Sequence, residues 1–376
     1  MRRKILTGVV LVGLIVLPGM GHGLFGKTAP TQAPQPRPGG VPIFQVDPSW
    51  PKVPEKWKVG GVSNIAVDAQ DHVWILQRPR TLPADQTLAA APPVLEFDAA
   101  GNHIRGWGGP GKGYDWPENE HGIHVDYKGN VWIGGNSCPE RNTPGLKPVT
   151  DDQLLKFTAD GKFVLQIGQS NKSRGNSDTE NLHLPADAFV YRKTNEVFVA
   201  DGYGNRRVIV FDAETGAFRR MWGAFGNKPV APFECPTDAY DRSVIGDKGP
   251  GPQQFHVVHA IRVSNDGLVY VADRNYRRVQ VFTIDGKFVN QVFIGRTTGG
   301  GPGAVAFSPD SEQKFMYVAS AEIVVLNRKT LEVLDSVAGK GAHYLATDSK
   351  GNIYTALLAR GAQKFVFKGL SSAPSR

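Results

Sequence analysis

The chain has 376 residues, of which 40% are hydrophobic and 21% are charged, a composition typical of a folded globular protein. Its 44 glycines and 27 prolines are spread along the sequence, as in proteins that join many short strands by turns. The net charge of +8 comes from scattered Lys and Arg residues without a long basic run, which argues against a nucleic-acid-binding protein.

The N-terminal segment, residues 1–26, has the features of a secretory signal peptide, because a basic start is followed by a short apolar run that stops at Pro18. The apolar run is short for a membrane-spanning helix, so an uncleaved N-terminal anchor is the alternative. Residues 27–42 are Pro-rich and predict a flexible tether. We therefore expect an exported protein, periplasmic or extracellular, with no other membrane contact. We also expect a monomer.

A pattern of short strands recurs six times between residues 43 and 370. Each unit has an alternating strand, a second strand with an aromatic residue, and in most units a third apolar strand followed by a turn. The aligned aromatic residues are Trp74, Trp132, Phe198, Tyr270, Tyr317 and Tyr354. Several turns carry Asp-Gly or Ala-Gly pairs, which suit hairpins.

These six units predict an all-β protein, a six-bladed β-propeller over residues 43–370 with a short C-terminal tail at 371–376. Residues 43–50, "IFQVDPSW", precede the first unit and are available as the N-terminal strand that closes the ring. An elongated β-solenoid fits less well, because the lengths of the units vary widely.

Equivalent positions on the innermost strands of a propeller meet around its central axis. The position eleven residues before each aromatic, with unit five matched through "GAVAFS", gives Ser63, His121, Asp187, His259, Gly303 and His343. Histidine therefore occupies units two, four and six, which stand about 120° apart in a six-fold ring. Three converging imidazoles are typical of a catalytic zinc site with an open fourth position. The alternative is that each histidine separately binds channel water or backbone.

A second group of residues leaves the second strands toward one mouth of the channel. Arg78 and Arg274 lie four residues after the aromatic in units one and four, and Tyr203 lies one residue further on in unit three. Two guanidiniums suit a substrate that carries a carboxylate, and a tyrosine beside a metal and an arginine can act as a base. The alternatives are surface ion pairs for the arginines and blade packing for the tyrosine. Nearby arginines are expected to be solvated surface charge, namely Arg80, Arg206, Arg207, Arg277 and Arg278.

Two features of the predicted loops stay open. The two cysteines, Cys138 and Cys235, are outside any C-x-x-C motif, and the sequence does not establish whether they form a disulfide. Residues 223–253 form a long polar insertion that either covers a channel mouth and sets specificity or is a disordered bulge.

Three stretches, "EHGIHVDYKGNVWI", "VFVADGYGNRRVIVFD" and "FHVVHAIRVSNDGLVYVADRNYRRVQVF", resemble the NHL-repeat propeller of peptidyl-α-hydroxyglycine α-amidating lyase, a similarity that spans roughly residues 60–360. The resemblance implies a zinc-dependent carbon–nitrogen lyase that cleaves the N–Cα bond of a peptidyl-α-hydroxyglycine to give an amide and glyoxylate. It also implies that Tyr203 is the general base and that Arg78 and Arg274 bind the substrate and activate that base. The implied zinc ligands are His121, His259 and His343.

The chain departs from this family at two positions. Gly204 stands where the family has a disulfide-bonded cysteine, so that bridge is absent. Tyr344 stands where an acidic residue of the family helps to hold calcium, which puts a calcium site in doubt.

Asp187 is a candidate hydrogen-bond partner for a zinc-binding histidine.

Two other functions compete with the lyase. One is a non-catalytic NHL-repeat propeller that binds a protein or glycan partner through one face. The other is a lactonase-type propeller, whose metal ligands are carboxylates and asparagines. The axial series offers only Asp187 for that purpose.

Overall fold

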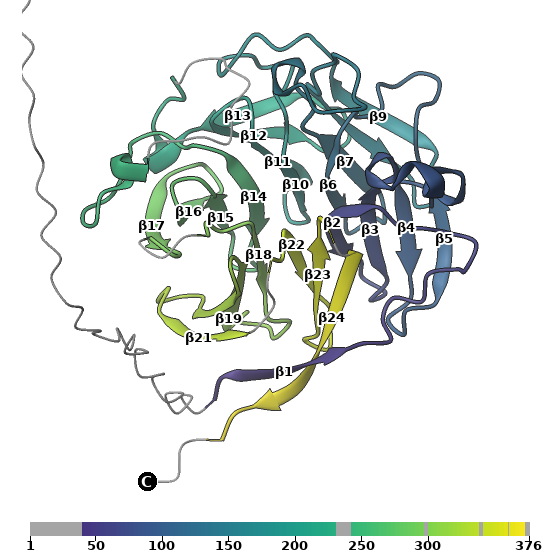
Figure 1. Cartoon of the computed structure of the whole chain (residues 1–376). Helices are drawn as coiled ribbons and strands as arrows, with labels where there is room; N and C mark the ends of the chain where they lie inside the picture. Colours follow the sequence, from purple (N-terminus) through teal and green to yellow (C-terminus); the bar gives the residue numbers. More distant parts are fainter. Residues whose placement is uncertain (1–39, 231–241, 297–299, 338–340, 360, 373–376) are drawn as a thin grey trace, which may run out of the picture. The chain divides into compact units, whose positions relative to one another are not determined.

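The structure is a computed structural model that describes residues 40–230, 242–296, 300–337, 341–359 and 361–372. Six four-stranded antiparallel sheets are arranged as blades around a central axis (Figure 1). The predicted six-bladed β-propeller is thereby confirmed. The helical segments of the described residues are five short 3-10 turns, Pro79–Thr81, Ala84–Ala89, Pro139–Arg141, Ala224–Gly226 and Arg242–Ile245.

The first three blades follow one another in chain order. Blade one contains β2 (Gly61–Val67), β3 (Val73–Arg78), β4 (Val94–Phe97) and β5 (His103–Trp107). Blade two contains β6 (Glu120–Val125), β7 (Val131–Gly135), β8 (Gln153–Phe157) and β9 (Phe163–Gly168). Blade three contains β10 (Asp187–Tyr191), β11 (Glu196–Asp201), β12 (Arg207–Asp212) and β13 (Phe218–Trp222).

The last three blades repeat this order. Blade four contains β14 (Val258–Val263), β15 (Leu268–Asp273), β16 (Arg278–Thr283) and β17 (Phe288–Phe293). Blade five contains β18 (Ala304–Phe307), β19 (Phe315–Ala319), β20 (Ile323–Asn327) and β21 (Val333–Val337). Blade six contains β22 (Tyr344–Thr347), β23 (Ile353–Leu357), β24 (Gly361–Leu370) and β1 (Pro42–Asp47).

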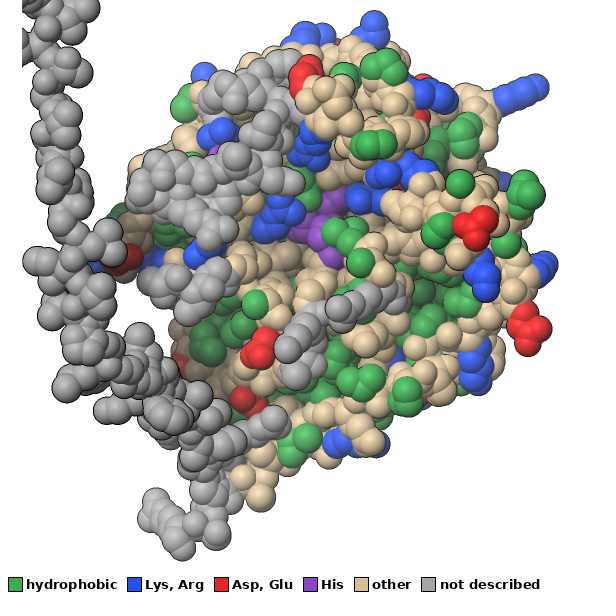
Figure 2. Space-filling model, viewed as in Figure 1, with side chains coloured by type: hydrophobic (Ala, Val, Ile, Leu, Met, Phe, Trp, Pro, Cys, Tyr) green, Lys and Arg blue, Asp and Glu red, His purple; other side chains and the backbone are tan. Residues whose placement is uncertain are grey.

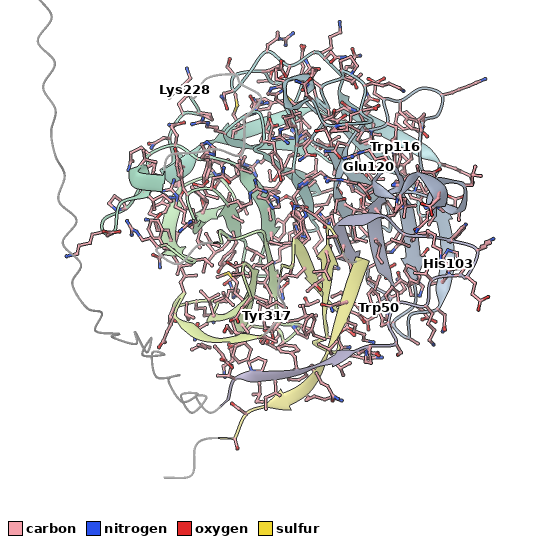
Figure 3. The ribbon with its side chains drawn as sticks, viewed as in Figure 1. Trp50, His103, Trp116, Glu120, Lys228 and Tyr317 are labelled. Atoms are coloured by element: carbon pink, nitrogen blue, oxygen red, sulfur yellow. The ribbon has the colours of Figure 1, made fainter. Side chains whose placement is uncertain are left out.

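The ring is closed by the N-terminal strand, as the sequence predicts. Strand β1 pairs antiparallel with β24, with Gln45 opposite Val366, so the first described strand completes the last blade. Trp50, which follows β1 and is labelled in Figure 3, packs against Phe97 of blade one and Tyr354 of blade six at ring-centroid distances of 6.2 and 5.0 Å. Closure thus pairs a strand edge that would otherwise be exposed and joins the first and last blades by aromatic packing.

The aligned aromatic residues are the core of the blades, and each is at most 2% exposed. In three blades the polar tip of the aromatic residue donates a hydrogen bond to an Asp six residues upstream. These bonds join Trp74 to Asp68 (2.9 Å), Trp132 to Asp126 (3.0 Å) and Tyr354 to Asp348 (3.0 Å). A buried indole or phenol needs such a partner, so the repeated aromatic and the repeated Asp form one unit.

The expectation that the arginines after Tyr203 and Arg274 are surface charge is wrong for three of them. Arg207 and Arg278 are fully buried, and their Nε atoms donate to Asp201 and Asp273 at 2.8 and 3.0 Å. Each arginine begins the third strand of its blade opposite the aspartate that ends the second strand, so the strand register creates the pair. Arg277 is also buried, at 4% exposure.

Several expectations about the chain ends and loops fall outside the described residues. The signal at 1–26 and most of the tether at 27–42 precede residue 40, and Cys235 lies within 231–241, so its pairing with Cys138 is not described. The same gap interrupts the 223–253 insertion. Within the described part of the chain, no helix has the length and apolar character needed to cross a membrane.

Candidate metal centre

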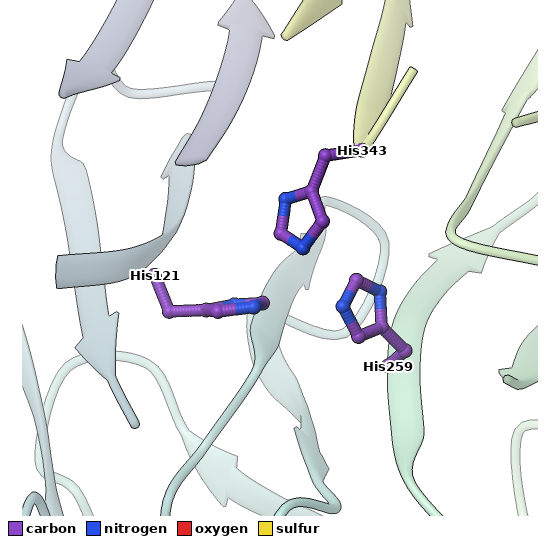
Figure 4. A group of neighbouring side chains, drawn as sticks. All are labelled: His121, His259 and His343. Carbon is purple, nitrogen blue, oxygen red and sulfur yellow. The ribbon is translucent and has the colours of Figure 1, made fainter. Parts of the chain in front are cut away.

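Three histidines converge at the centre of the ring. His121 belongs to β6, His259 to β14, and His343 immediately precedes β22, so they come from blades two, four and six. Their ring centroids lie 4.9–5.0 Å apart, and one ring nitrogen from each lies within 4.8 Å of the others (Figure 4). The structure therefore brings the histidine trio together as the repeat register predicts.

The intervening blades hold each imidazole through its Nδ1 atom. A backbone carbonyl can only accept a hydrogen bond, so each Nδ1 carries the hydrogen and each Nε2 keeps its lone pair. The contacts join Nδ1 of His121 to the oxygen of Ala186 (2.8 Å), Nδ1 of His259 to that of Gly303 (2.5 Å), and Nδ1 of His343 to that of Ser63 (2.6 Å). This is the tautomer that a metal ligand bound through Nε2 requires.

The surroundings of the trio keep the imidazoles neutral. Burial, and then the neighbouring imidazoles and Arg78, lower the pKa of His121 well below 6.5. Burial, followed by the charge of Arg274, does the same to the pKa of His259. Burial lowers the pKa of His343 to about 3. Neutral imidazoles crowded around one point are available as ligands for a cation.

Tyr203 places its hydroxyl between two of these imidazoles. The oxygen lies 3.0 Å from Nε2 of His121 and 3.0 Å from Nε2 of His259, and it accepts a hydrogen bond of 2.9 Å from Nη1 of Arg274. A hydroxyl has one hydrogen, so it satisfies only one of the two Nε2 lone pairs. The remaining lone pair faces an oxygen without a hydrogen between them. A cation shared by the imidazoles would resolve this mismatch, so the residues present fit a metal ion.

Arg78 and Arg274 border a cavity of about 540 Å³ that Tyr203 also lines. Arg78 ends β3, donates from Nε to the Glu120 carbonyl at 2.7 Å, and has its pKa lowered by burial to about 10, so it stays charged at neutral pH. Arg274 follows β15 and lies with its guanidinium 5.1 Å from the centre of the Tyr203 ring. Histidine side chains are visible in a hollow near the centre of the molecule, beside Lys and Arg side chains (Figure 2).

Asp187 does not contact a histidine of the trio, which corrects its expected role. Its carboxylate accepts hydrogen bonds from Arg262 (2.5 Å) and from the backbone of Ile261 (3.1 Å), while burial raises its pKa. The reason lies in the direction of the side chain, which points from β10 to the neighbouring β14. The carbonyl of the preceding residue, Ala186, holds His121 instead.

Two residues at the site were not predicted to take part. Arg141 lies in the loop after β7 and places its guanidinium 5.0 Å from the centre of the Tyr203 ring, in a segment outside the repeat register. Tyr344 packs against the three imidazoles at centroid distances of 5.0–5.7 Å, and its hydroxyl contacts the carbonyls of Ala186 and His259. Burial raises the pKa of Tyr344 well above 10, so this position next to the trio holds a neutral ring.

Sequence similarity to known proteins extends over most of the propeller. No family model matches the chain. NHL repeat-containing protein 3 of Homo sapiens is 26% identical over 348 residues, which are 86% of this chain and 84% of that protein. The chain resembles the NHL-repeat propellers. Peptidyl-glycine alpha-amidating monooxygenase A of Xenopus laevis is 26% identical over 342 residues, 83% of this chain but 32% of that protein.

Two further matches concern proteins named as lyases. The Caenorhabditis elegans protein named probable peptidyl-alpha-hydroxyglycine alpha-amidating lyase is 28% identical over 165 residues, 43% of this chain and 36% of that protein. Among solved structures, a streptogramin B lyase aligns with a TM-score of 0.51 and 13% identity, covering 86% of this chain and 98% of that one. At this identity the structural match supports the fold alone. The sequence matches relate the chain to amidating enzymes at low identity.

Proposed function

We propose that the chain is a zinc-dependent lyase that cleaves the N–Cα bond of α-hydroxyglycine amides, giving an amide and glyoxylate. The observation that carries the proposal is the joint placement of three neutral imidazoles and the Tyr203 hydroxyl, which lies 3.0 Å from two of their Nε2 atoms and 2.9 Å from Arg274. The similarity to amidating enzymes supports the same reaction class. We further propose that the protein is exported and monomeric.

His121, His259 and His343 would hold the zinc through Nε2. When bound, zinc supplies Lewis-acid chemistry that makes a substrate hydroxyl easier to deprotonate. The carbonyls of Ala186, Gly303 and Ser63 keep the three rings in the orientation that this requires.

Tyr203 would act as the general base that accepts the proton of the substrate α-hydroxyl. Arg274, which donates to the Tyr203 oxygen at 2.9 Å, stabilises the negative charge on that oxygen. A lone pair on the deprotonated α-hydroxyl oxygen of the substrate then forms the aldehyde C=O bond as the N–Cα bond breaks. The departing amide nitrogen takes up one proton, which balances the proton that Tyr203 has received.

Arg78 would bind the carboxylate of the glycine unit. Its guanidinium borders the cavity and remains positively charged at neutral pH, with a pKa of about 10. Because Nε is already engaged by the Glu120 carbonyl, the group is held in a fixed direction, which favours one orientation of the substrate.

To test this proposal, the purified protein is incubated with a peptide that ends in α-hydroxyglycine, and the glyoxylate formed is measured. The expected result is glyoxylate formed in step with the amide by the wild type, and its loss in Tyr203→Phe. If the wild type contains zinc and forms no glyoxylate from such peptides, this substrate assignment is wrong.

A non-catalytic propeller that binds a protein or glycan is the second candidate. It is favoured by the match to NHL repeat-containing protein 3, which extends over most of both chains. This candidate predicts neither bound zinc nor glyoxylate, so the zinc content and the glyoxylate assay together separate the two.

A further inference from the structure

The loop that carries Tyr203 is packed directly against a buried histidine outside the metal centre. A Cβ atom built on Gly204 would lie 1.9 Å from Cδ2 of His183, whereas carbon atoms in contact stay about 3.5–4.0 Å apart. The imidazole of His183 therefore fills the space that a side chain at position 204 would need. This excludes any larger residue at 204 as long as the imidazole keeps its place.

Hydrogen bonds hold both the side chain and the backbone of His183. Its Nδ1 lies 2.8 Å from Oδ1 of Asp152, and the side chains are only 5% and 2% exposed. The backbone nitrogen of His183 donates to Asp201 at 2.8 Å. The other carboxylate oxygen of Asp152 accepts two backbone hydrogen bonds of 3.0 Å, from Lys172 and Ser173. A pair held in this way cannot turn away from Gly204 without breaking buried contacts.

The same segment also holds the backbone of the Tyr203 loop. Gly204 and Asn205 donate to the carbonyl of His183 at 3.1 and 3.3 Å, and Tyr203 donates to that of Leu184 at 3.3 Å. On another side the loop contacts blade four, because a Cβ atom on Gly202 would lie 2.1 Å from the oxygen of Val258. The loop is therefore confined between the segment at 183–184 and β14.

We propose that His183 is a positioning residue for Tyr203, oriented by Asp152. The inference rests on the proposed function, in which Tyr203 is the base. Its hydroxyl must stay near two imidazoles and Arg274, and a displacement of about 1 Å can cost about 100-fold in rate. The imidazole sets this position by filling space against Gly204.

The first test measures the packing of His183 against Gly204 through thermal stability and needs no activity assay. Gly204→Ala alone is expected to lower Tm clearly, because the added methyl overlaps the imidazole. In a His183→Ala background the same substitution is expected to lower Tm much less, because the obstructing ring is gone. Equal Tm changes in the two backgrounds would overturn the inference, whether or not the protein is a lyase.

The second test separates positioning from folding. His183→Ala is expected to lower kcat about tenfold or more, with KM changed less than about twofold and zinc content unchanged. His183→Gln, which fills space and can still bond to Asp152, is expected to recover part of kcat. The matched control is His72→Ala, because His72 also pairs with a carboxylate at 2.8 Å, that of Glu96 in blade one.

The outcomes of the second test are distinct. Unchanged kcat in His183→Ala would refute the positioning role while leaving the proposed lyase intact. A wild type that makes no glyoxylate would refute the lyase and the positioning role together, and the Tm comparison would then still report whether His183 excludes a side chain at 204.

Discussion

Each histidine of the trio uses one ring nitrogen for the fold and leaves the other for chemistry. The Nδ1 atoms bond to carbonyls of Ala186, Gly303 and Ser63, all within one residue of the axial positions in the odd-numbered blades. Blades without histidine are therefore as necessary as blades with it, since they fix the tautomer and the direction of each ring. The residue types at the odd positions matter less than their backbone.

Tyr203→Phe tests the role of the hydroxyl at this scale. It removes the proposed base while keeping the ring, so kcat should fall at least about 100-fold with zinc content and Tm nearly unchanged. Steady-state kinetics with glyoxylate detection measure this. Tyr127→Phe is the control, because Tyr127 is 42% exposed and its hydroxyl donates to Asn195, away from the histidine trio. A Tyr203→Phe enzyme with wild-type kcat would exclude the tyrosine as base.

At the scale of strands, irregularities in pairing direct the ligands inward. The register shifts between Val62 and Asn64, between Glu120 and Gly122, and between Val258 and Ala260. The residues passed over are Ser63, His121 and His259, three of the six axial positions. Such bulges turn a side chain away from the regular alternation of a strand. The site geometry thus depends on local departures from ideal β-structure.

The sequence predicts some features of the fold and of the site but not others. The repeat predicts the blades and the axial series, because the spacing between aromatic residue and inner strand is nearly constant. It does not reveal which way Asp187 points, since its pairing with Arg262 depends on the neighbouring blade. It also misses Arg141, which lies in a loop without a repeat, and the burial of Arg278, which needs the register of β15 with β16.

The buried pair of Arg278 and Asp273 yields a prediction about stability. Both side chains are 0% exposed, and the guanidinium also donates to the carbonyls of Pro250 and Gln254. Arg278→Ala leaves a buried carboxylate unpaired, so the free energy of unfolding should fall by about 3–5 kcal/mol. Arg219→Ala removes an exposed partner of Asp212, where about 0–1 kcal/mol is expected. Denaturant unfolding measures both changes. Equal decreases in the free energy of unfolding would contradict the larger stabilising role assigned to the buried pair.

At the scale of the whole molecule, the metal centre depends on closure of the ring. His343 lies in blade six, the blade that β1 completes from the other end of the chain. The three ligands are separated by 138 and 84 positions in the sequence, so no local segment can bring them together. We therefore expect metal binding and propeller stability to be coupled.

Phe44→Ala tests the closure. Phe44 of β1 packs against Tyr317 of blade five and Phe367 of blade six, at centroid distances of 5.7 and 5.9 Å. Because its side chain is only partly buried, the free energy of unfolding should fall by about 2–3 kcal/mol, below the usual range for a fully buried Phe. Val46→Ala on the same strand, 43% exposed, should change it by less than about 0.5 kcal/mol. Matching effects would mean that β1 contributes little to closing the ring.

The most direct test of the account is the metal content of the purified protein, measured by elemental analysis. We predict about one zinc per chain in the wild type, its loss in His259→Ala, and its retention in His103→Ala, which alters a histidine of the outer strand β5. A folded wild-type protein that contains no zinc and takes up none when zinc is added would contradict the central claim.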